Sequence, residues 1–434
     1  MRFEVRRLAA DLGGELHGDD ATVDGVAIDS RLLQPGQLFA AVRAERDGHD
    51  FVGAAIAAGA AAALVERPVE GVRSVVVPDV SRALMRMAGL ARRRLPDRVV
   101  GITGSVGKTT TKDLLAAALA THFRTTANER SFNNELGVPL TLANAPEDTE
   151  AAVVEMGARG HGHIALLCSM ARPTVGIELA VAAVHVEMMG GLDQIMVAKR
   201  ELVEALPRDG VAVLNAADPR VMAMAAHTPA AVLTFGEGGA VTATGVELDA
   251  DLVPTFTLES DWGRATVRLG VRGEHNVSNA LAAAAAALWL GVPVAAVADG
   301  LGRVAASPWR MDLRTAPSGA LVLNDAYNAS PTSVAAALRS LASLPAARRV
   351  AVLGYMAELG ASERADHEGI AALCGELGVE LVAVGTDLYG VEPVADAPAA
   401  LAVLGGVDAG TAVLVKASRV AGLERVAAAL LVDG

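Results

Sequence analysis

The chain contains few aromatic residues and few cysteines. Aromatic residues make up 3% of its 434 residues, and Cys168 and Cys374 are the two cysteines. Two cysteines provide neither a disulfide framework nor the spacing of a metal site, so we expect two buried thiols in a reducing cytoplasm. Alanine supplies much of the 52% hydrophobic content. This composition suits α/β domains with alanine-rich helices and valine-rich strands.

Basic residues are also too few to offset the acidic ones. The net charge is −13, with no long basic stripe, which argues against a nucleic-acid partner.

The N-terminal sequence MRFEVRRLAADLGG has no apolar signal-peptide core. The uncharged stretch 280–298 is interrupted by Gly291-Val292-Pro293, so it predicts a buried helix, a turn and a second short helix, with no membrane span.

One stretch, Gly101–Ala120, has the pattern of a strand, a glycine turn and a helix. Glycines let backbone N–H groups approach an anion, and a helix N-terminus adds unpaired donors and a positive dipole end. Ile102 stands where the general P-loop pattern has glycine, so this is the narrower T-G-x-x-G-K-T form. The alternative is a tight turn with an exposed lysine. The candidate phosphate-binding residues are Gly104, Ser105, Gly107, Lys108, Thr109 and Thr110.

Glu155 ends the apolar run AAVVE. Ligands of open α/β sheets bind at the carboxyl ends of the strands, so Glu155 is a candidate Mg²⁺ ligand or a solvated acid at the end of a strand. His185 follows another apolar stretch, where a lone histidine is more often structural.

Lys199 lies on the apolar face of a helix predicted over 193–207, together with Ile195 and Leu202. A buried lysine favours the neutral amine, which can react with CO₂ to form a carbamate, an oxygen ligand for Mg²⁺. Spacing alone favours the alternative, a lysine whose charged end reaches the solvent.

Two pairs of asparagines lie in positions where a ligand could be contacted. Asn276 and Asn279 share one face at the start of a helix, where either could also cap it. Asn133 and Asn134 lie in a polar loop before Gly137.

Residues 231–272 alternate in β fashion and predict a peripheral hairpin. After residue 308, alternating strands and helices predict a parallel Rossmann-like sheet without a G-x-G-x-x-G fingerprint.

Eleven motifs are spread along the whole chain: IDSR, DGHDF, TGSVGKTTTK, SFNNELGVPLTL, VEMG, AKRE, GEHNVSNALAAA, WRMD, NDAYNASP, GYMAELG and VKASR. Together they resemble the motifs of the Mur ligases of peptidoglycan synthesis. NNELGVPLTL and DAYNASP are specific to the branch that adds D-alanyl-D-alanine. The resemblance implies an α/β fold of three domains: a small UDP-sugar-binding domain (1–97), a P-loop-type ATPase domain (98–307) and a Rossmann-like domain (308–434).

The resemblance also implies that the enzyme binds ATP and Mg²⁺ and that Lys199 carries a carbamate. The implied catalytic residues are Lys108, His185 and Lys199. The implied nucleotide-binding residues beyond the glycine turn are Asn276, Asn279, Arg310 and Asp325. The implied Mg²⁺ ligands are Thr109, Glu155, His185 and Lys199. The implied substrate-binding residues are Ser30, Asn133, Asn134, Tyr327 and Asn328.

The implied partners are UDP-MurNAc-tripeptide and D-Ala-D-Ala, acted on by a cytoplasmic monomer. Four residues in three motifs depart from the family pattern: Leu179-Ala180 replaces a T-N pair, Tyr355 replaces an aspartate and Ala417 replaces a glycine. Three alternatives stay open. The first is a ligase of the same fold that acts on another amino acid or on a folate or cyanophycin-type substrate. The others are a homologue that binds ATP without catalysis and a sugar or small-molecule kinase.

Overall fold

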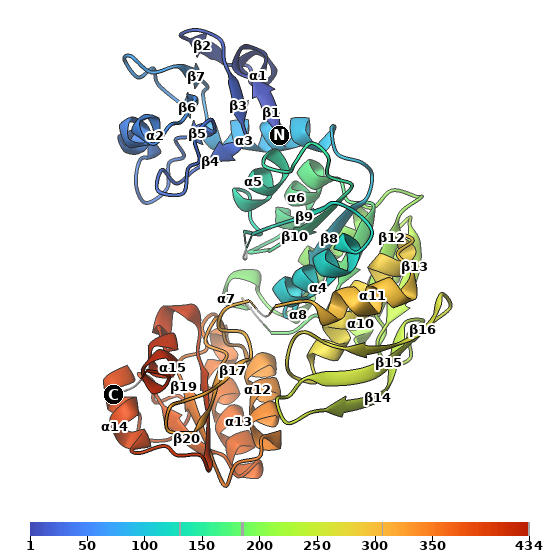
Figure 1. The fold of residues 1–434 in the computed structure, drawn as a ribbon, viewed down its shortest axis with the longest axis vertical. Helices are drawn as coiled ribbons and strands as arrows, with labels where there is room; N and C mark the ends of the chain where they lie inside the picture. The colour runs from blue at the N-terminus through green and yellow to red at the C-terminus, as the bar shows by residue number, and fades with distance from the viewer. Residues whose placement is uncertain (130–131, 184–185, 306, 433–434) are drawn as a thin grey trace.

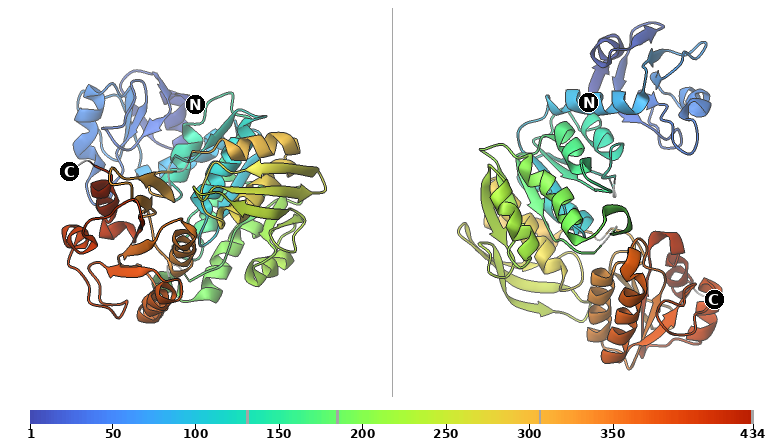
Figure 2. Two further views of the ribbon diagram at one scale, coloured as in Figure 1. Left: turned by 60° about the horizontal axis from the view of Figure 1, so that its bottom comes forward. Right: turned by 180° about the vertical axis from the view of Figure 1, so that it is seen from behind.

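The computed structural model describes residues 1–129, 132–183, 186–305 and 307–432. The chain forms three α/β domains, with the first and third at opposite ends and the central one between them (Figure 1). The view from behind shows the same succession (Figure 2).

The first domain is built on a small twisted sheet. Its elements are β1 (Arg2–Glu4), α1 (Val5–Leu12), β2 (Glu15–His17), β3 (Thr22–Asp24), β4 (Val26–Ala27), β5 (Leu38–Ala40), η1 (Gly48–Phe51), α2 (Val52–Ala57), β6 (Ala62–Val65), β7 (Ser74–Val76) and α3 (Val80–Arg92). The strand order is β2-β7-β6-β5-β4, with β2 antiparallel to β7 and the other pairs parallel. Helix α3 links two cores, because Leu84 and Met87 pack in the first domain and Ala88 and Ala91 in the second.

The central domain contains the glycine turn. Its elements are β8 (Val99–Thr103), α4 (Lys108–Ala120), β9 (Thr125–Ala127), α5 (Gly137–Ala143), β10 (Ala151–Glu155), α6 (His163–Ala171), β11 (Val175–Glu178), α7 (Val186–Met189), α8 (Leu192–Glu204), β12 (Val211–Asn215), α9 (Pro219–Ala223), η2 (Met224–His227), β13 (Ala231–Phe235), β14 (Thr242–Leu248), β15 (Pro254–Ser260), β16 (Gly263–Arg268), α10 (Asn276–Trp289) and α11 (Val294–Gly302). The parallel sheet has the order β13-β12-β11-β8-β10-β9.

Strand β8 lies inside this sheet and is buried along its whole length. Successive side chains of a strand point to opposite faces: Val100 and Ile102 pack with α4 and α10, and Val99 packs with α5, α6 and α8. A strand buried on both faces reads as an unbroken apolar run. The carboxyl end of β8 therefore opens between two helical layers.

The predicted peripheral hairpin is confirmed for β15 and β16, which pair antiparallel, but its range of 231–272 is too wide. Residues 231–235 form β13, the parallel edge strand of the central sheet, and β14, β15 and β16 form a separate three-stranded antiparallel sheet packed against α10 and α11. A half-covered edge strand and a hairpin strand show the same alternation, so the pattern could not distinguish them.

The third domain is a mostly parallel sheet between two pairs of helices. Its elements are β17 (Asp312–Thr315), β18 (Leu321–Asn324), α12 (Pro331–Ser343), β19 (Arg348–Leu353), η3 (Gly360–Ser362), α13 (Glu363–Glu376), β20 (Glu380–Ala383), α14 (Ala397–Leu404), β21 (Thr411–Lys416), η4 (Arg419–Ala421) and α15 (Glu424–Leu430). The order is β17-β18-β21-β19-β20, with β17 antiparallel. The parallel Rossmann-like prediction missed this edge strand, because its pairing depends on the turn that joins it to β18.

Two other expectations are confirmed. Both cysteines are buried. The stretch 280–298 falls in two helices, α10 and α11, separated by a turn. In the part of the chain that the structure describes, no helix combines the length and the apolar character needed to cross a bilayer.

The packing of α11 on α4 depends on a glycine. A Cβ at Gly300 would lie 2.5 Å from Ala118 Cα and 2.7 Å from the Ala117 carbonyl oxygen. Backbone atoms cannot rotate away, so we expect Gly300→Ala to lower the melting temperature, with an overpacking cost of about 1–3 kcal/mol. Gly89→Ala in α3 is the matched control, since a Cβ there meets nothing within 4 Å, and we expect a small gain. Equal shifts in differential scanning calorimetry would contradict this packing.

Candidate active site between the central and third domains

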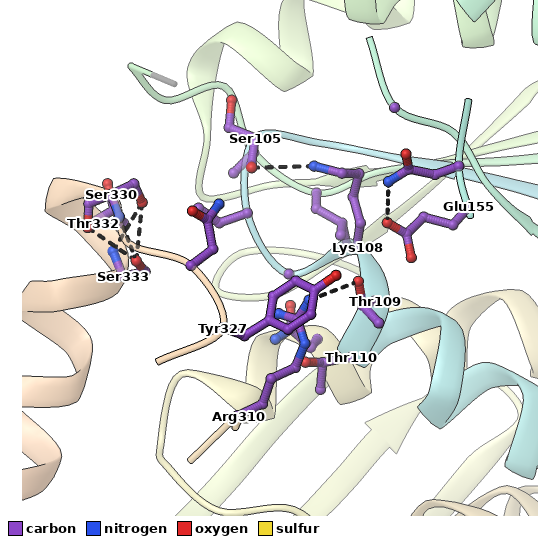
Figure 3. A pocket seen from close by; sticks show the side chains of 18 of the residues that line it. Ser105, Lys108, Thr109, Thr110, Glu155, Arg310, Tyr327, Ser330, Thr332 and Ser333 are labelled. Atoms are coloured by element: carbon purple, nitrogen blue, oxygen red, sulfur yellow. Dashed lines mark hydrogen bonds between the residues drawn. The ribbon is translucent and has the colours of Figure 1, made fainter. Parts of the chain in front are cut away.

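A cavity of about 700 Å³ lies between the central and third domains (Figure 3). The central domain contributes the glycine turn, the end of β10, one face of α8 and the start of α10 to its wall. The third domain contributes the segment before β17, the turn after β18 and the start of α12. Predicted residues that line the cavity are Ser105, Gly107, Lys108, Thr109, Thr110, Asn133, Asn134, Glu155, Lys199, Asn276, Asn279, Arg310, Asp325, Tyr327 and Asn328.

The glycine turn is packed tightly from below. Gly104 and Gly107 have φ values of +149° and +84°, a region that side chains with a Cβ rarely adopt. A Cβ at Gly104 would lie 2.8 Å from Leu179 Cβ, and one at Gly107 would lie 2.3 Å from Asn279 Oδ1. The turn therefore requires glycine for its backbone shape and for its close approach to β11 and α10.

The lysine of the turn folds back on its own loop. Lys108 Nζ donates to the carbonyl oxygens of Gly104 at 2.6 Å and Ser105 at 3.3 Å. Burial lowers the pKa of Lys108, while nearby Glu155 acts in the opposite direction. With the free N–H groups at the start of α4, this arrangement is suited to holding an anion.

Glu155 presents one unpaired oxygen beside this turn. The residue is 1% exposed, and its Oε1 accepts a hydrogen bond from Asn133 Nδ2 at 2.7 Å. Its Oε2 is buried and has no hydrogen-bond partner among the described residues. A buried carboxylate oxygen without a partner is costly, and a divalent cation would satisfy it. Thr109, 6% exposed at the start of α4, offers a hydroxyl in the same cavity.

Lys199 lies on the inner face of α8 and is 4% exposed. Burial and, to a smaller extent, the charge of Lys108 lower its pKa to about 7, against the opposing effect of Glu178. A large fraction of the amine is therefore neutral near pH 7, which carbamate formation requires. The predicted inward position of Lys199 is confirmed, whereas the alternative that spacing favoured, a charged end in the solvent, is wrong. The carbamate stays a prediction.

Glu178 is a buried carboxylate that the sequence analysis missed. It ends β11 as Glu155 ends β10, is fully buried, and neither of its carboxylate oxygens has a hydrogen-bond partner among the described residues. Burial raises its pKa well above the usual range, opposed first by Lys199. Glu155 is in register with Ile102 and Glu178 with Thr103, so they lie on opposite faces of the sheet. The strand-end reasoning used for Glu155 would have found it.

The two asparagines of α10 hold each other in place. Asn279 Nδ2 donates to Asn276 Oδ1 at 2.7 Å, and Asn276 Nδ2 donates to the Arg272 carbonyl oxygen at 2.6 Å. The N-cap position is His275, and no side chain caps this helix, so the capping alternative is wrong. Both amides instead lie in the cavity wall beneath the glycine turn.

The third domain reaches the glycine turn through Arg310. Its Nη2 donates to Thr109 Oγ1 at 3.2 Å, and its guanidinium group lies 4.1 Å from the centre of the Tyr327 ring. Figure 3 shows the three side chains together at the start of α4. This cation–π contact holds the arginine extended across the boundary between the domains.

Some predicted residues are elsewhere or have other partners. His185 lies outside the described residues. Ser30 is not among the described residues that line the cavity. Asn134 Oδ1 accepts hydrogen bonds from the backbone N–H groups of Leu136 and Gly137, so this side chain is bonded to the backbone just before and at the first residue of α5. These contacts leave the predicted substrate roles untested.

The three departures from the family pattern fit the surrounding structure. At Leu179 and Ala180, backbone carbonyls accept hydrogen bonds from Asn215 Nδ2 and the Ser105 amide, each at 2.8 Å, so these two bonds do not depend on the side chains. The Tyr355 hydroxyl group donates a hydrogen bond to Glu363 Oε1, and this bond is the main cause that raises the pKa of Tyr355 to about 12. Ala417 is fully buried.

Comparisons with known proteins find similarity to Mur ligases along the whole chain. Family models described as Mur ligase family, catalytic domain, Mur ligase middle domain, and Mur ligase, glutamate ligase domain match residues 22–98, 102–287 and 309–430. The UDP-N-acetylmuramoyl-tripeptide–D-alanyl-D-alanine ligase of Mycobacterium tuberculosis is 42% identical, covering 100% of this chain and 98% of the relative. The Escherichia coli ligase of the same name is 36% identical, covering 99% and 98%.

The chain is also similar to solved structures of Mur ligases. A crystal structure of MurF from Acinetobacter baumannii has a TM-score of 0.90 at 31% identity, covering 99% of both chains. MurF from Thermotoga maritima in complex with ADP has a TM-score of 0.81 at 28% identity, covering 93% of this chain and 96% of the other. A folylpolyglutamate synthase of M. tuberculosis, at 20% identity and a TM-score of 0.64 over 80% of this chain and 92% of the other, shares the fold alone.

The close packing of the glycine turn can be tested by substitution. We expect Gly107→Ala to lower the melting temperature, because the left-handed backbone alone costs about 1–2 kcal/mol for alanine and the new methyl group would displace Asn279. Gly160→Ala is the control, since that loop glycine has no positive φ and open space around it. If both variants melted like the parent chain, the turn would not be constrained as described.

Proposed function

The chain belongs to the Mur ligase family, and from this we propose that it is the ligase that joins D-alanyl-D-alanine to UDP-N-acetylmuramoyl-tripeptide with ATP. The 42% identity over the full chain to ligases of that name carries the assignment. The cavity supports it, because a phosphate-binding turn, a buried lysine and a third-domain arginine meet in one place.

We propose that the reaction proceeds through an acyl phosphate. The γ-phosphoryl group of ATP passes to the terminal carboxylate of the tripeptide, releasing ADP and making a good leaving group of a poor one. The amine of D-Ala-D-Ala attacks the acyl carbon, the tetrahedral intermediate loses phosphate, and the amine proton goes to solvent. Two anions meet in the first step, so Lys108 and Arg310 would screen them, while the third domain excludes water from the acyl phosphate.

A short movement of Lys108 would engage the nucleotide. Its bonds to the Gly104 and Ser105 carbonyl oxygens would be exchanged for bonds to the β and γ phosphates. The backbone of Gly104–Gly107 and the N-terminus of α4 would hold those phosphates, with Ser105 and Thr110 beside them. Asn276 and Asn279 would contact the nucleotide from α10, and Asp325 from the third domain.

Mg²⁺ fits the residues at the end of β10. Glu155 Oε2 is a buried oxygen that needs a positive partner, and we propose Glu155 and Thr109 as ligands, joined by His185 and the Lys199 carbamate in accord with the resemblance. Bound Mg²⁺ would neutralise the charge that develops on the phosphoryl oxygens. Asn133 would hold the second oxygen of Glu155, a supporting bond of the kind that orients metal ligands.

The remaining substrate contacts are proposed by domain. Ser30 and the first domain, residues 1–97, would bind the UDP-sugar. Asn133 and Asn134 of the central domain, residues 98–307, would lie near the peptide, and Tyr327 and Asn328 of the third domain, residues 308–434, near the dipeptide. The gap between α3 and β8 and that between α11 and β17 support these boundaries. We propose a cytoplasmic monomer.

The assignment predicts dipeptide-dependent phosphate release. Purified protein with Mg²⁺, ATP and UDP-MurNAc-tripeptide should release phosphate when D-Ala-D-Ala is added, with a product heavier by the dipeptide less water. N-acetylated D-Ala-D-Ala is the control, because it has no free amine and should give no such product. ATP binding without release would overturn the assignment and indicate a non-catalytic homologue, and a product formed only with another amino acid would indicate a different ligase.

The Lys199 carbamate predicts a pH-dependent NMR signal. With ¹³C-bicarbonate, the wild type should show a carbamate resonance that grows as the pH rises through about 7, the pKa of Lys199, because the neutral amine reacts and the ammonium does not. Lys199→Met should show no such resonance. A resonance that persists in Lys199→Met, or none at any pH, would contradict the carbamate.

A further inference from the structure

Lys416 is a buried lysine for which the roles above have no use. It is the last residue of β21 and is 3% exposed. Its ammonium group donates to Asp325 Oδ2 at 2.5 Å, to the Asn328 carbonyl oxygen at 2.8 Å and to the Asp325 carbonyl oxygen at 3.3 Å. One buried cation therefore ties together three acceptors of the turn that follows β18.

Asp325 extends this contact to the segment that enters the third domain. Its Oδ1 accepts a hydrogen bond from the Met311 backbone N–H at 3.1 Å, and the Tyr327 N–H donates to the Trp309 carbonyl oxygen at 3.2 Å. Trp309 and Met311 have φ values of 59° and 49°. Such left-handed conformations cost side chains about 1–2 kcal/mol each, so they persist only where neighbours hold them.

Arg310 lies between these two left-handed residues. The bonds on either side of it fix the direction of its side chain, which passes over the Tyr327 ring to Thr109 Oγ1. An unbroken series of contacts therefore runs from Lys416 through Asp325 and Met311 to Arg310 and the first turn of α4.

We propose that Lys416 is a positioning residue for phosphoryl transfer: by fixing Asp325 and the turn after β18, it places the Arg310 guanidinium group at the first turn of α4. The inference rests on the proposed function for the identity of the step. Both carboxylate oxygens of Asp325 are engaged in this framework, so Asp325 acts at least in part on the segment that carries Arg310.

The first test compares the kinetics of Lys416 variants. We expect Lys416→Met to lower kcat for dipeptide-dependent phosphate release by about a hundredfold, since misplacing a group by about 1 Å can cost that much, with the KM for the UDP substrate unchanged. Lys416→Arg keeps a cation and should regain part of the loss. Arg348→Met is the control, because Arg348 binds Glu380 at the opposite end of the same sheet; its kcat should stay within about twofold.

A double-mutant cycle separates positioning from general damage. If Lys416 acts through Arg310, Lys416→Met should cause little further loss in an Arg310→Ala background, because contacts in one series are not additive. Losses that multiply, or an unchanged kcat in Lys416→Met, would overturn the proposal.

Hydrogen exchange tests the contact without relying on activity. The Met311 amide, bonded to Asp325 Oδ1, should exchange faster in Lys416→Met than in the wild type or in Arg348→Met. Unchanged exchange would refute the positioning role. An inactive wild type that still shows the exchange difference would refute the proposed function alone.

Discussion

The site depends on the close approach of one glycine turn to the elements beneath it. Gly104 touches the end of β11 and Gly107 touches α10, so the turn is supported from below while the N–H groups at the start of α4 face the cavity. A bulkier turn would separate β8 from its neighbours or close the anion site. This requirement fixes Leu179 and Asn279 next to the glycine turn. The parallel pairing of β10 and β11 with β8 brings the carboxyl ends of these strands to the same edge.

Charge burial at that edge gives the site its chemistry. The sheet separates Glu155 from Glu178, so the Glu155 carboxylate faces the glycine turn and the Glu178 carboxylate lies on the same side as Lys199. Each acid lacks partners for at least one oxygen among the described residues, and Lys199 is held at a pKa of about 7. Burying a carboxylate oxygen without a partner costs free energy, and a lysine with this pKa is partly neutral near pH 7. Both properties are consistent with a site that binds a cation and modifies a lysine.

The third domain completes the cavity through a few polar contacts. Arg310 crosses to Thr109, and the left-handed residues on either side of it are held by the turn after β18.

The departures at Leu179 and Ala180 fit the central domain, because the hydrogen bonds to Asn215 and Ser105 there use backbone carbonyl oxygens. Substitutions at these two positions therefore leave those bonds in place.

Much of the fold and part of the site could be predicted from residues alone. The strand–turn–helix at Gly101–Ala120, the inward face of Lys199, the strand-end position of Glu155 and the two helices over 280–298 all follow from local spacing. The edge strand β13 did not, because alternation is the same in an edge strand and a hairpin, and β17 did not, because its pairing depends on the turn that joins it to β18. Glu178 and Lys416 also end apolar runs, yet spacing gave no sign that Glu178 is fully buried or that Lys416 binds Asp325 and the Asn328 carbonyl oxygen.

The sequence by itself determined the family, the glycine turn between a strand and a helix, and which residues face inward, because these depend on local geometry and on motifs that span the chain. Only the tertiary structure decided which strand ends meet, which face of the sheet each carboxylate occupies, and that Lys416 and Asp325 hold the segment carrying Arg310. Those contacts join residues far apart in the chain, so they depend on register and domain packing, which short-range patterns do not contain.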